Sequence, residues 1–244
     1  MTSEPPPDRP TFQLDGHEIP FEPGQSVLAA ALAAGRYIPY LCYHREFEPH
    51  GSCKVCTVRV NGRPHASCTE PARDGDVVES SADDLTEQRK TLVQFLFTEG
   101  NHFCPSCEAS GSCTLQAVGY ELGMTTAHFS PLFPDRPLDA SHPDVLLDLN
   151  RCILCELCVR ASALVDKKSV FSLSGRGITK HLVVNAESGR LGDTDLALDD
   201  KAMSVCPVGV ILRKRRGFAV PIGERTYDAE PVRVVALTSR REDP

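Results

Sequence analysis

Cysteine is the residue that most constrains how this chain can fold. The 244 residues include eleven cysteines, which fall into three groups with different spacings. The N-terminal segment lacks the apolar core of a secretory signal, so we expect a cytoplasmic protein. Thiols stay reduced in that compartment, and an odd number of cysteines cannot all pair as disulfides. The cysteines are therefore predicted to be metal ligands.

The first group consists of four cysteines: Cys42, Cys53, Cys56 and Cys68. Their spacing suits four thiolates that converge on a [2Fe–2S] cluster from a loop and a neighbouring strand. Gly51 would let this loop bend tightly and bring backbone N–H groups close to sulfur. The alternative is a zinc site, but zinc ribbons usually contain two close cysteine pairs. Cys42 and Cys68 each stand alone, so the cluster is favoured.

The second group has three cysteines, Cys104, Cys107 and Cys113, with His102 just upstream. Three thiolates would leave one iron of a [4Fe–4S] cluster without a protein ligand. A neutral imidazole can ligate iron, so His102 is the candidate for the fourth position. The alternatives are Asn101, Glu108, a water molecule or a three-iron cluster.

The third group is a triplet, Cys152, Cys155 and Cys158, completed by Cys206 in front of Pro207. This is the pattern of bacterial ferredoxins. In two-cluster ferredoxins the remote cysteine serves the other cluster, but this chain has one triplet and one such Cys-Pro. We therefore expect these four cysteines to bind a single [4Fe–4S] cluster. Their spacing suits the corner of a cube better than a zinc tetrahedron.

The three groups use all eleven cysteines and predict one [2Fe–2S] and two [4Fe–4S] clusters. The chain has no G-x-G-x-x-G or P-loop motif, so no flavin or nicotinamide is expected to bind it. No catalytic constellation stands out, and we predict no catalytic residue. A net charge of −7 argues against nucleic-acid binding. The longest apolar stretch, residues 27–34, is too short to span a bilayer.

Turn and periodicity signals divide the chain into compact α+β units. A hairpin is expected from strands at 11–14 and 17–21, and a second from residues 55–60 and 63–68, each around a turn ending in glycine. Helices are expected at 27–34 after a Ser26 cap, at 83–98 and at 114–122. The predicted organisation is a disordered lead at 1–10, units at 11–82 and 83–128, a proline-rich linker at 129–144, a third unit at 145–222 and a tail at 223–244.

Basic residues raise two further expectations. The run at 213–216 is predicted to be a solvated face, with a contact to a partner or to the tail as the alternative. Lys54 and Arg151 adjoin candidate ligands. Their charges could raise cluster potentials by stabilising an added electron, or they could be simple surface charges.

The order of the three groups resembles the N-terminal part of the large iron–sulfur subunit of respiratory complex I. Because the chain stops soon after the third group, it resembles the small diaphorase (iron–sulfur, gamma-type) subunit of cytoplasmic NAD-reducing nickel–iron hydrogenases. The runs at 99–107, 111–120 and 206–211 carry this resemblance. Complex I relatives place three residues between the histidine and the next cysteine, whereas here only Phe103 intervenes, which separates this chain from that branch.

The resemblance implies a fold class and a role. It implies an α+β chain with an N-terminal β-grasp [2Fe–2S] ferredoxin domain, a small helical [4Fe–4S] domain ligated by one His and three Cys, and a C-terminal bacterial-ferredoxin-like [4Fe–4S] domain. It also implies an electron relay between a flavin- and NAD-binding diaphorase subunit and the small and large nickel–iron hydrogenase subunits. The alternatives are the equivalent subunit of an NAD-dependent formate dehydrogenase, a stand-alone ferredoxin-like carrier and a zinc-binding interaction protein.

Overall fold

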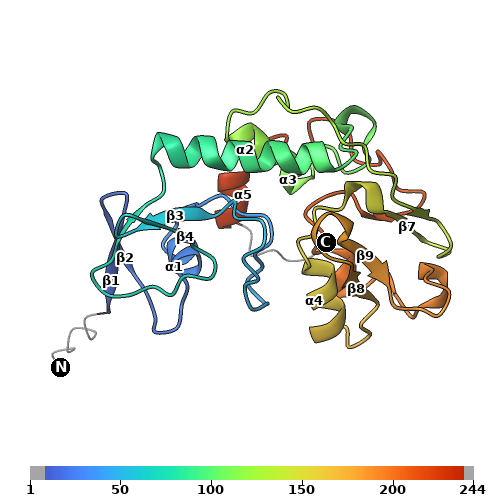
Figure 1. Ribbon diagram of the computed structural model, residues 1–244, viewed down its shortest axis with the longest axis horizontal. Helices are drawn as coiled ribbons and strands as arrows, with labels where there is room; N and C mark the ends of the chain where they lie inside the picture. The colour runs from blue at the N-terminus through green and yellow to red at the C-terminus, as the bar shows by residue number, and fades with distance from the viewer. Residues whose placement is uncertain (1–8, 239–244) are drawn as a thin grey trace.

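The structure is a computed structural model that describes residues 9–238. Two globular parts lie side by side beneath one long helix, α2 (Asp83–Glu99), which runs above both of them (Figure 1). No helix in the described part of the chain has the length and apolar character needed to span a membrane.

The first part is a five-stranded sheet with the strand order β2-β1-β5-β3-β4. Its strands are β1 (Thr11–Leu14), β2 (His17–Pro20), β3 (Thr57–Val60), β4 (Arg63–Ala66) and β5 (Val77–Glu79). β1 and β5 run parallel, and the other pairings are antiparallel. Both predicted hairpins form, because the Asp-Gly and Asn-Gly turns adopt positive φ angles that match the twist of the strands.

Helix α1 (Val27–Ala33) packs on this sheet. The side chain of Ser26 accepts a hydrogen bond from the Ala29 N–H, as the predicted N-terminal cap requires. The residues of α1 join Phe12, Ile19 and Val58 in a compact apolar core. These features form one α+β unit, as the sequence predicts.

The second unit consists of α2, a short 3-10 turn η1 (Cys104–Ser106) and α3 (Thr114–Glu121). Leu85 and Val93 of α2 are buried. Leu92 and Leu96 are half-buried in the apolar core that also contains Val93. Arg89 of α2 is also buried, which hydrophobic periodicity did not predict.

The third unit is built from two small sheets and one helix. One sheet has the order β10-β7-β6, and β8 pairs with β9 in the other. The strands are β6 (Leu138–Asp139), β7 (Val145–Asp148), β8 (Phe171–Ser174), β9 (His181–Val184) and β10 (Ile211–Arg213), and the helix is α4 (Leu157–Leu164). The segment predicted as a linker contains strand β6, which forms because its backbone pairs with that of β7. Four 3-10 turns connect these elements: η2 (Leu149–Arg151), η3 (Gly177–Thr179), η4 (Leu191–Asp193) and η5 (Lys201–Met203).

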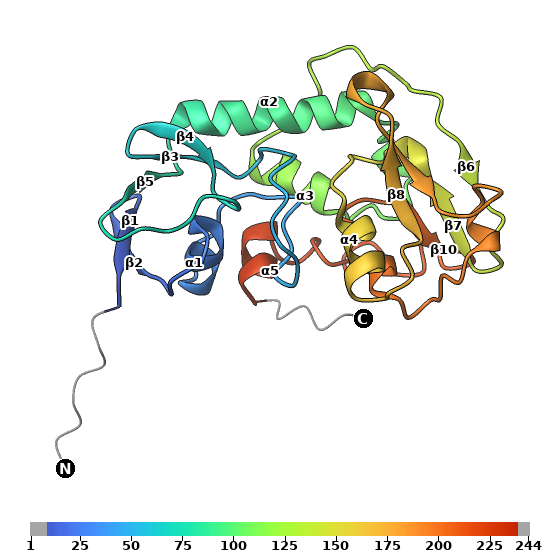
Figure 2. The same cartoon turned by 60° about the horizontal axis from the view of Figure 1, so that its bottom comes forward.

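The segment predicted as a tail instead contains helix α5 (Val232–Thr238). It lies between α1 and the third unit, next to α3 (Figure 2). Val232 and Ala236 are buried on its inner face, so a short apolar stripe, missed in the sequence, holds the helix in place. Residues 1–8 of the predicted lead and 239–244 of the tail lie outside the described residues.

The basic run at 213–216 is mostly exposed but anchors neighbouring loops. Arg213 donates to the Leu198 carbonyl at 2.8 Å. Lys214 Nζ donates to the carbonyls of Ala140 and His142 at 2.6 Å each. The run is therefore not only a solvated face, since its side chains also hold neighbouring loops.

A larger apolar core crosses the boundary between units. It includes the third unit and α3, but also Leu41, Cys42, Phe47 and Val55 from the loop between α1 and β3. The loop that carries the first cysteines thus packs on the third unit as well as on its own sheet.

Candidate iron–sulfur sites

The first group of cysteines converges from the loop before β3, the start of β3 and the end of β4. The thiol of Cys42 is in hydrogen-bonding contact with those of Cys53 and Cys68, and these contacts hold the pKa of Cys42 well below its usual range. A contact with Cys68 lowers the pKa of Cys56 to about 7. Thiols in hydrogen-bonding contact lie close together, as ligands of one cofactor must.

The loop around these cysteines depends on Gly51. Its φ is +70°, and an added Cβ would lie 2.9 Å from Thr69 Cγ2. A side chain here would be strained and crowded at once, so the tight bend predicted from the sequence is present. Lys54 also has a positive φ, of 56°, and its carbonyl accepts the Thr57 hydroxyl at 2.6 Å.

The second group lies around η1 and the start of α3. Cys107 N–H donates to the Cys104 carbonyl at 3.2 Å, and Cys113 is the N-terminal cap residue of α3. Burial raises the pKa of Cys113 to about 12, with further contributions from the charges of Cys107 and Cys104. The structure therefore brings the three predicted cysteines within electrostatic reach of one another.

His102 is half-buried next to this group. Its Nε2 has no hydrogen-bond partner among the described residues. Burial, and then the charge of Arg151, lower the pKa of His102 to about 4, so the imidazole is neutral near pH 7. Its ring packs edge-on against Phe97 with centroids 5.4 Å apart, and an added Cβ on Gly100 would meet Nε2 at 2.6 Å. A buried, neutral and unpartnered nitrogen fits a ligand to iron.

The two side chains weighed as alternatives to His102 have other partners. Asn101 Nδ2 donates to Asn150 Oδ1 at 3.2 Å, although its own Oδ1 is unpaired. Glu108 forms an ion pair with Arg151 at 2.8 Å. Glu108 is thus committed to a structural contact.

The third group lines a single small pocket. Cys152, Cys155, Cys158 and Cys206 all face it, with apolar neighbours that include Leu173 and Leu182. Burial raises the pKa of Cys152 to about 11, and the charge of Cys206 adds to this. The remote cysteine is therefore next to the triplet, as the single-cluster prediction requires.

The loop of the triplet follows an unusual backbone path. Leu154 and Glu156 both have positive φ angles, of 54° and 61°. Non-glycine residues rarely adopt this left-handed conformation, which costs free energy unless the surroundings impose it. Here the conformation lets the loop wrap the cavity with three closely spaced thiols.

A zinc site would place its donors about 2.0–2.3 Å from one ion. No group of three or more His, Cys, Asp or Glu side chains within residues 9–238 has an arrangement that could hold a metal ion.

The third group lies between the other two. The charge of Cys42 contributes to the raised pKa of Cys155, for which burial is the main cause. On the other side, the Pro207 carbonyl accepts the Thr114 N–H at 2.9 Å and contacts Cys113 Sγ at 3.7 Å. The cysteine groups therefore form a row in the order first, third, second, which differs from their order in the sequence.

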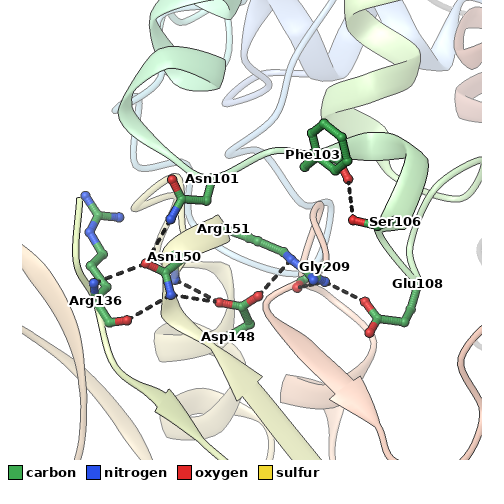
Figure 3. A network of polar contacts seen from close by, with 9 residues as sticks. All are labelled: Asn101, Phe103, Ser106, Glu108, Arg136, Asp148, Asn150, Arg151 and Gly209. Atoms are coloured by element: carbon green, nitrogen blue, oxygen red, sulfur yellow. Dashed lines mark hydrogen bonds and ion pairs between the residues drawn. The ribbon is translucent and has the colours of Figure 1, made fainter. Parts of the chain in front are cut away.

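A polar network joins the second and third units (Figure 3). Arg151 pairs with Glu108 of the second unit and with Asp148 of the third, both at 2.8 Å. Asn150 accepts the Asn101 N–H on its backbone carbonyl at 2.8 Å. The charge of Arg151 is thus offset by two carboxylates, which favours a structural role over the tuning role considered from the sequence.

Two arginines that sequence reasoning missed reach the backbone of candidate ligands. Arg136 Nη1 donates to the Cys152 carbonyl at 3.0 Å. Arg160 Nη2 donates to the Cys42 carbonyl at 2.9 Å. Every residue offers a carbonyl, so the sequence carries no signal for such contacts.

Three protein families match successive parts of the chain. The 2Fe-2S iron-sulfur cluster binding domain matches residues 8–83. The NADH-ubiquinone oxidoreductase-G iron-sulfur binding region matches residues 89–128, and the 4Fe-4S single cluster domain matches residues 145–212. Their order confirms the predicted fold class.

Similar curated proteins include the NAD-reducing hydrogenase HoxS subunit gamma of Cupriavidus necator. It is 42% identical over 227 residues, which are 92% of this chain and 95% of that protein. The NADPH-Fe(3+) oxidoreductase subunit alpha of Geobacter sulfurreducens is 28% identical over 84% of this chain. The mitochondrial NADH-ubiquinone oxidoreductase 78 kDa subunit of Candida albicans is 30% identical over 84%. The chain spans only 24% and 28% of these two longer proteins.

A solved structure has the same fold. It is the crystal structure of NAD+-reducing [NiFe]-hydrogenase in the H2-reduced state, in which one chain matches with a TM-score of 0.89 and 56% identity. The match covers 91% of this chain and 94% of that one.

Fold, cysteine groups and matches together define an iron–sulfur protein in which a 2Fe-2S domain precedes 4Fe-4S domains. Within that class, the chain belongs to the family of the gamma subunit of NAD-reducing hydrogenase, as the resemblance in the sequence indicated.

Proposed function

We propose that this chain is the electron-relay subunit of a hydrogen:NAD oxidoreductase complex. The observation that carries the proposal is the row of three cysteine groups in a chain that spans 95% of a hydrogenase gamma subunit. Such a row has no evident use in a protein that transfers no electrons. The clusters would supply one-electron chemistry, and the chain would bind, separate and shield them.

The proposed ligands follow the three groups. A [2Fe–2S] cluster is held by Cys42, Cys53, Cys56 and Cys68. A [4Fe–4S] cluster is held by Cys104, Cys107, Cys113 and His102. A second [4Fe–4S] cluster is held by Cys152, Cys155, Cys158 and Cys206. The contacts between thiols, the orphan nitrogen of His102 and the four-cysteine cavity support this assignment.

The spatial row supports a route through the third group. Electrons would pass between the first and second groups by way of the central cluster, in either direction. One end of the row would face a flavin- and NAD-binding diaphorase subunit. The other would face the small subunit of a nickel–iron hydrogenase pair, and the whole complex would be cytoplasmic.

Purification of the tagged chain from its native host, without oxygen, tests this proposal. We expect the diaphorase and both hydrogenase subunits to co-purify and to show hydrogen-dependent NAD reduction. Metal analysis of this chain, separated from its partners with its clusters intact, should give about ten irons, from one two-iron and two four-iron clusters. Co-purification with a formate dehydrogenase, or elution of the loaded chain alone near its mass of 26.6 kDa, would contradict the assigned partners.

A further inference from the structure

Cys42, a proposed cluster ligand, lies at the boundary between the first and third units. Cys56 and Cys68 belong to the core of the first unit, whereas Cys42 belongs to the larger core that fills the third. The loop that carries Cys42 is therefore held from both sides. Whatever fixes this loop against the third unit also fixes the distance between the two cluster sites.

Arg160, on helix α4, spans this boundary with four hydrogen bonds to backbone carbonyls. Its Nη2 donates to Cys42 at 2.9 Å and, in a longer contact, to Cys155 at 3.4 Å. Its Nη1 donates to Glu48 at 2.6 Å, and its Nε to Glu156 at 3.3 Å. A single nitrogen thus connects the peptide of a ligand in the first group to the peptide of a ligand in the third.

The guanidinium group of Arg160 is held firmly in this position. Its Cζ lies 5.7 Å from the centre of the Phe47 ring, a cation–π arrangement. Phe47 is buried and stacks on His44 with ring centroids 4.6 Å apart. All polar contacts of Arg160 among the described residues are with carbonyls, so no carboxylate offsets its charge at short range.

We propose that Arg160 is a positioning residue for electron transfer between the clusters of the first and third groups. This inference rests on the proposed function. Arg160 fixes the gap between the two sites and connects them through hydrogen bonds. It also places a positive charge beside both of them.

The chemistry of the step explains why such a residue matters. One electron leaves one cluster, which is oxidised, and enters the other, which is reduced, and no bond is made or broken. The rate of such transfer falls steeply with distance, so a small widening of the boundary slows it. The planar fork of arginine can reach several carbonyls at fixed angles, which a lysine ammonium on a flexible stem cannot do.

The test uses the cluster-loaded full chain with Arg160→Met and Arg160→Lys. Arg45→Met is the matched control, because Arg45 lies on the loop that carries Cys42 but donates to the Ala236 carbonyl of α5 at 3.4 Å. After rapid reduction, freeze-quench EPR measures the rate of transfer between the two clusters. In the fully reduced chain, the power saturation of the [2Fe–2S] signal reports how strongly the neighbouring cluster relaxes it.

We expect Arg160→Met to slow transfer by about tenfold, equivalent to about 1.4 kcal/mol in activation free energy. The [2Fe–2S] signal should saturate at lower power, Arg160→Lys should fall in between, and Arg45→Met should match the wild type. Wild-type transfer and saturation in a fully loaded Arg160→Met chain would overturn the inference. If that variant fails to load, Arg160→Lys decides by the same two measurements. Absence of these cluster signals from the wild-type chain would instead overturn the proposed function.

Discussion

Single residues give the proposed clusters both their ligands and their electrostatic surroundings. The fold groups the thiols. The side chains of His102 and Arg89 say more about the surroundings of the proposed clusters. Each has a buried atom without a hydrogen-bond partner among the described residues: Nε2 in His102 and Nε in Arg89. A buried polar atom of this kind calls for an explanation, and for His102 a bound cluster provides one.

His102→Ala tests the fourth ligand of the second group. We expect it to lower the iron content from about ten to about nine per chain and to give the EPR signal of a three-iron cluster. Gly100→Ala should act in the same direction, because its Cβ would meet Nε2 at 2.6 Å and displace the ring. Phe97→Leu, which alters the packing of the ring but leaves the nitrogen, is the control. Full iron content in His102→Ala would assign the fourth ligand elsewhere.

Arg89 is predicted to raise the potential of the [2Fe–2S] cluster. Its guanidinium donates to the carbonyls of Thr57 and Ser80, both at 2.7 Å, and Thr57 directly follows the proposed ligand Cys56. Burial lowers the pKa of Arg89, and the charge of Cys56 is the main effect that opposes this. A positive charge near the cluster favours its reduced, more negative form.

Replacing Arg89 by Met should therefore shift the midpoint potential of that cluster downward. A tenfold loss in the reduction equilibrium corresponds to about 59 mV for one electron. Lys90→Met is the control, since Lys90 is the next residue of α2 and its ammonium pairs with Glu87 at 3.9 Å. An unchanged potential in Arg89→Met, measured by redox titration, would show that this charge does not act on the cluster.

At the scale of elements, short helices connect units that could otherwise move apart. Helix α5 packs against both α1 and α3, and Arg233 adds an ion pair with Glu121 of α3 at 3.2 Å. The helix has only seven residues, from Val232 to Thr238, and would be unstable alone in water. Its burial against other elements is what keeps it folded.

Val232→Ala tests this packing. Loss of the buried methyl groups should destabilise the chain by roughly 1–3 kcal/mol, since a fully buried Val side chain contributes about that much. Thr238→Ala, at an exposed site at the end of the same helix, should change the thermal midpoint little. Equal midpoints for both variants would mean that α5 contributes nothing to the stability of the folded chain.

At the scale of the whole molecule, the central position of the third group decides how the row operates. The first and second groups both contact this group, through the Cys42 loop and through the Pro207 carbonyl. Loss of the central cluster should therefore separate the two ends of the row electrically, even if both end clusters stay intact.

The variant Cys155→Ala tests this prediction, because it removes a proposed ligand of the central cluster. The signal of the central cluster should disappear, and hydrogen-dependent NAD reduction by the complex should fall by at least about a hundredfold, equivalent to about 2.7 kcal/mol. The [2Fe–2S] signal should remain. Phe103→Ala is the control, because Phe103 is 70% exposed and carries no ligand atom. Retained activity in Cys155→Ala without the central cluster would show that electrons take another route.

The local features of this protein could be predicted from its amino-acid sequence. The cysteine triplet, both hairpin turns, the Ser26 cap and the tight bend at Gly51 each depend on neighbours a few residues away, so spacing and residue type were enough to predict them. The tertiary structure alone decided the order of the groups in space, the helix in the supposed tail, and the contacts of Arg89, Arg151 and Arg160. These depend on packing between distant segments and, for two of the arginines, on backbone carbonyls, which every residue offers and no sequence pattern marks.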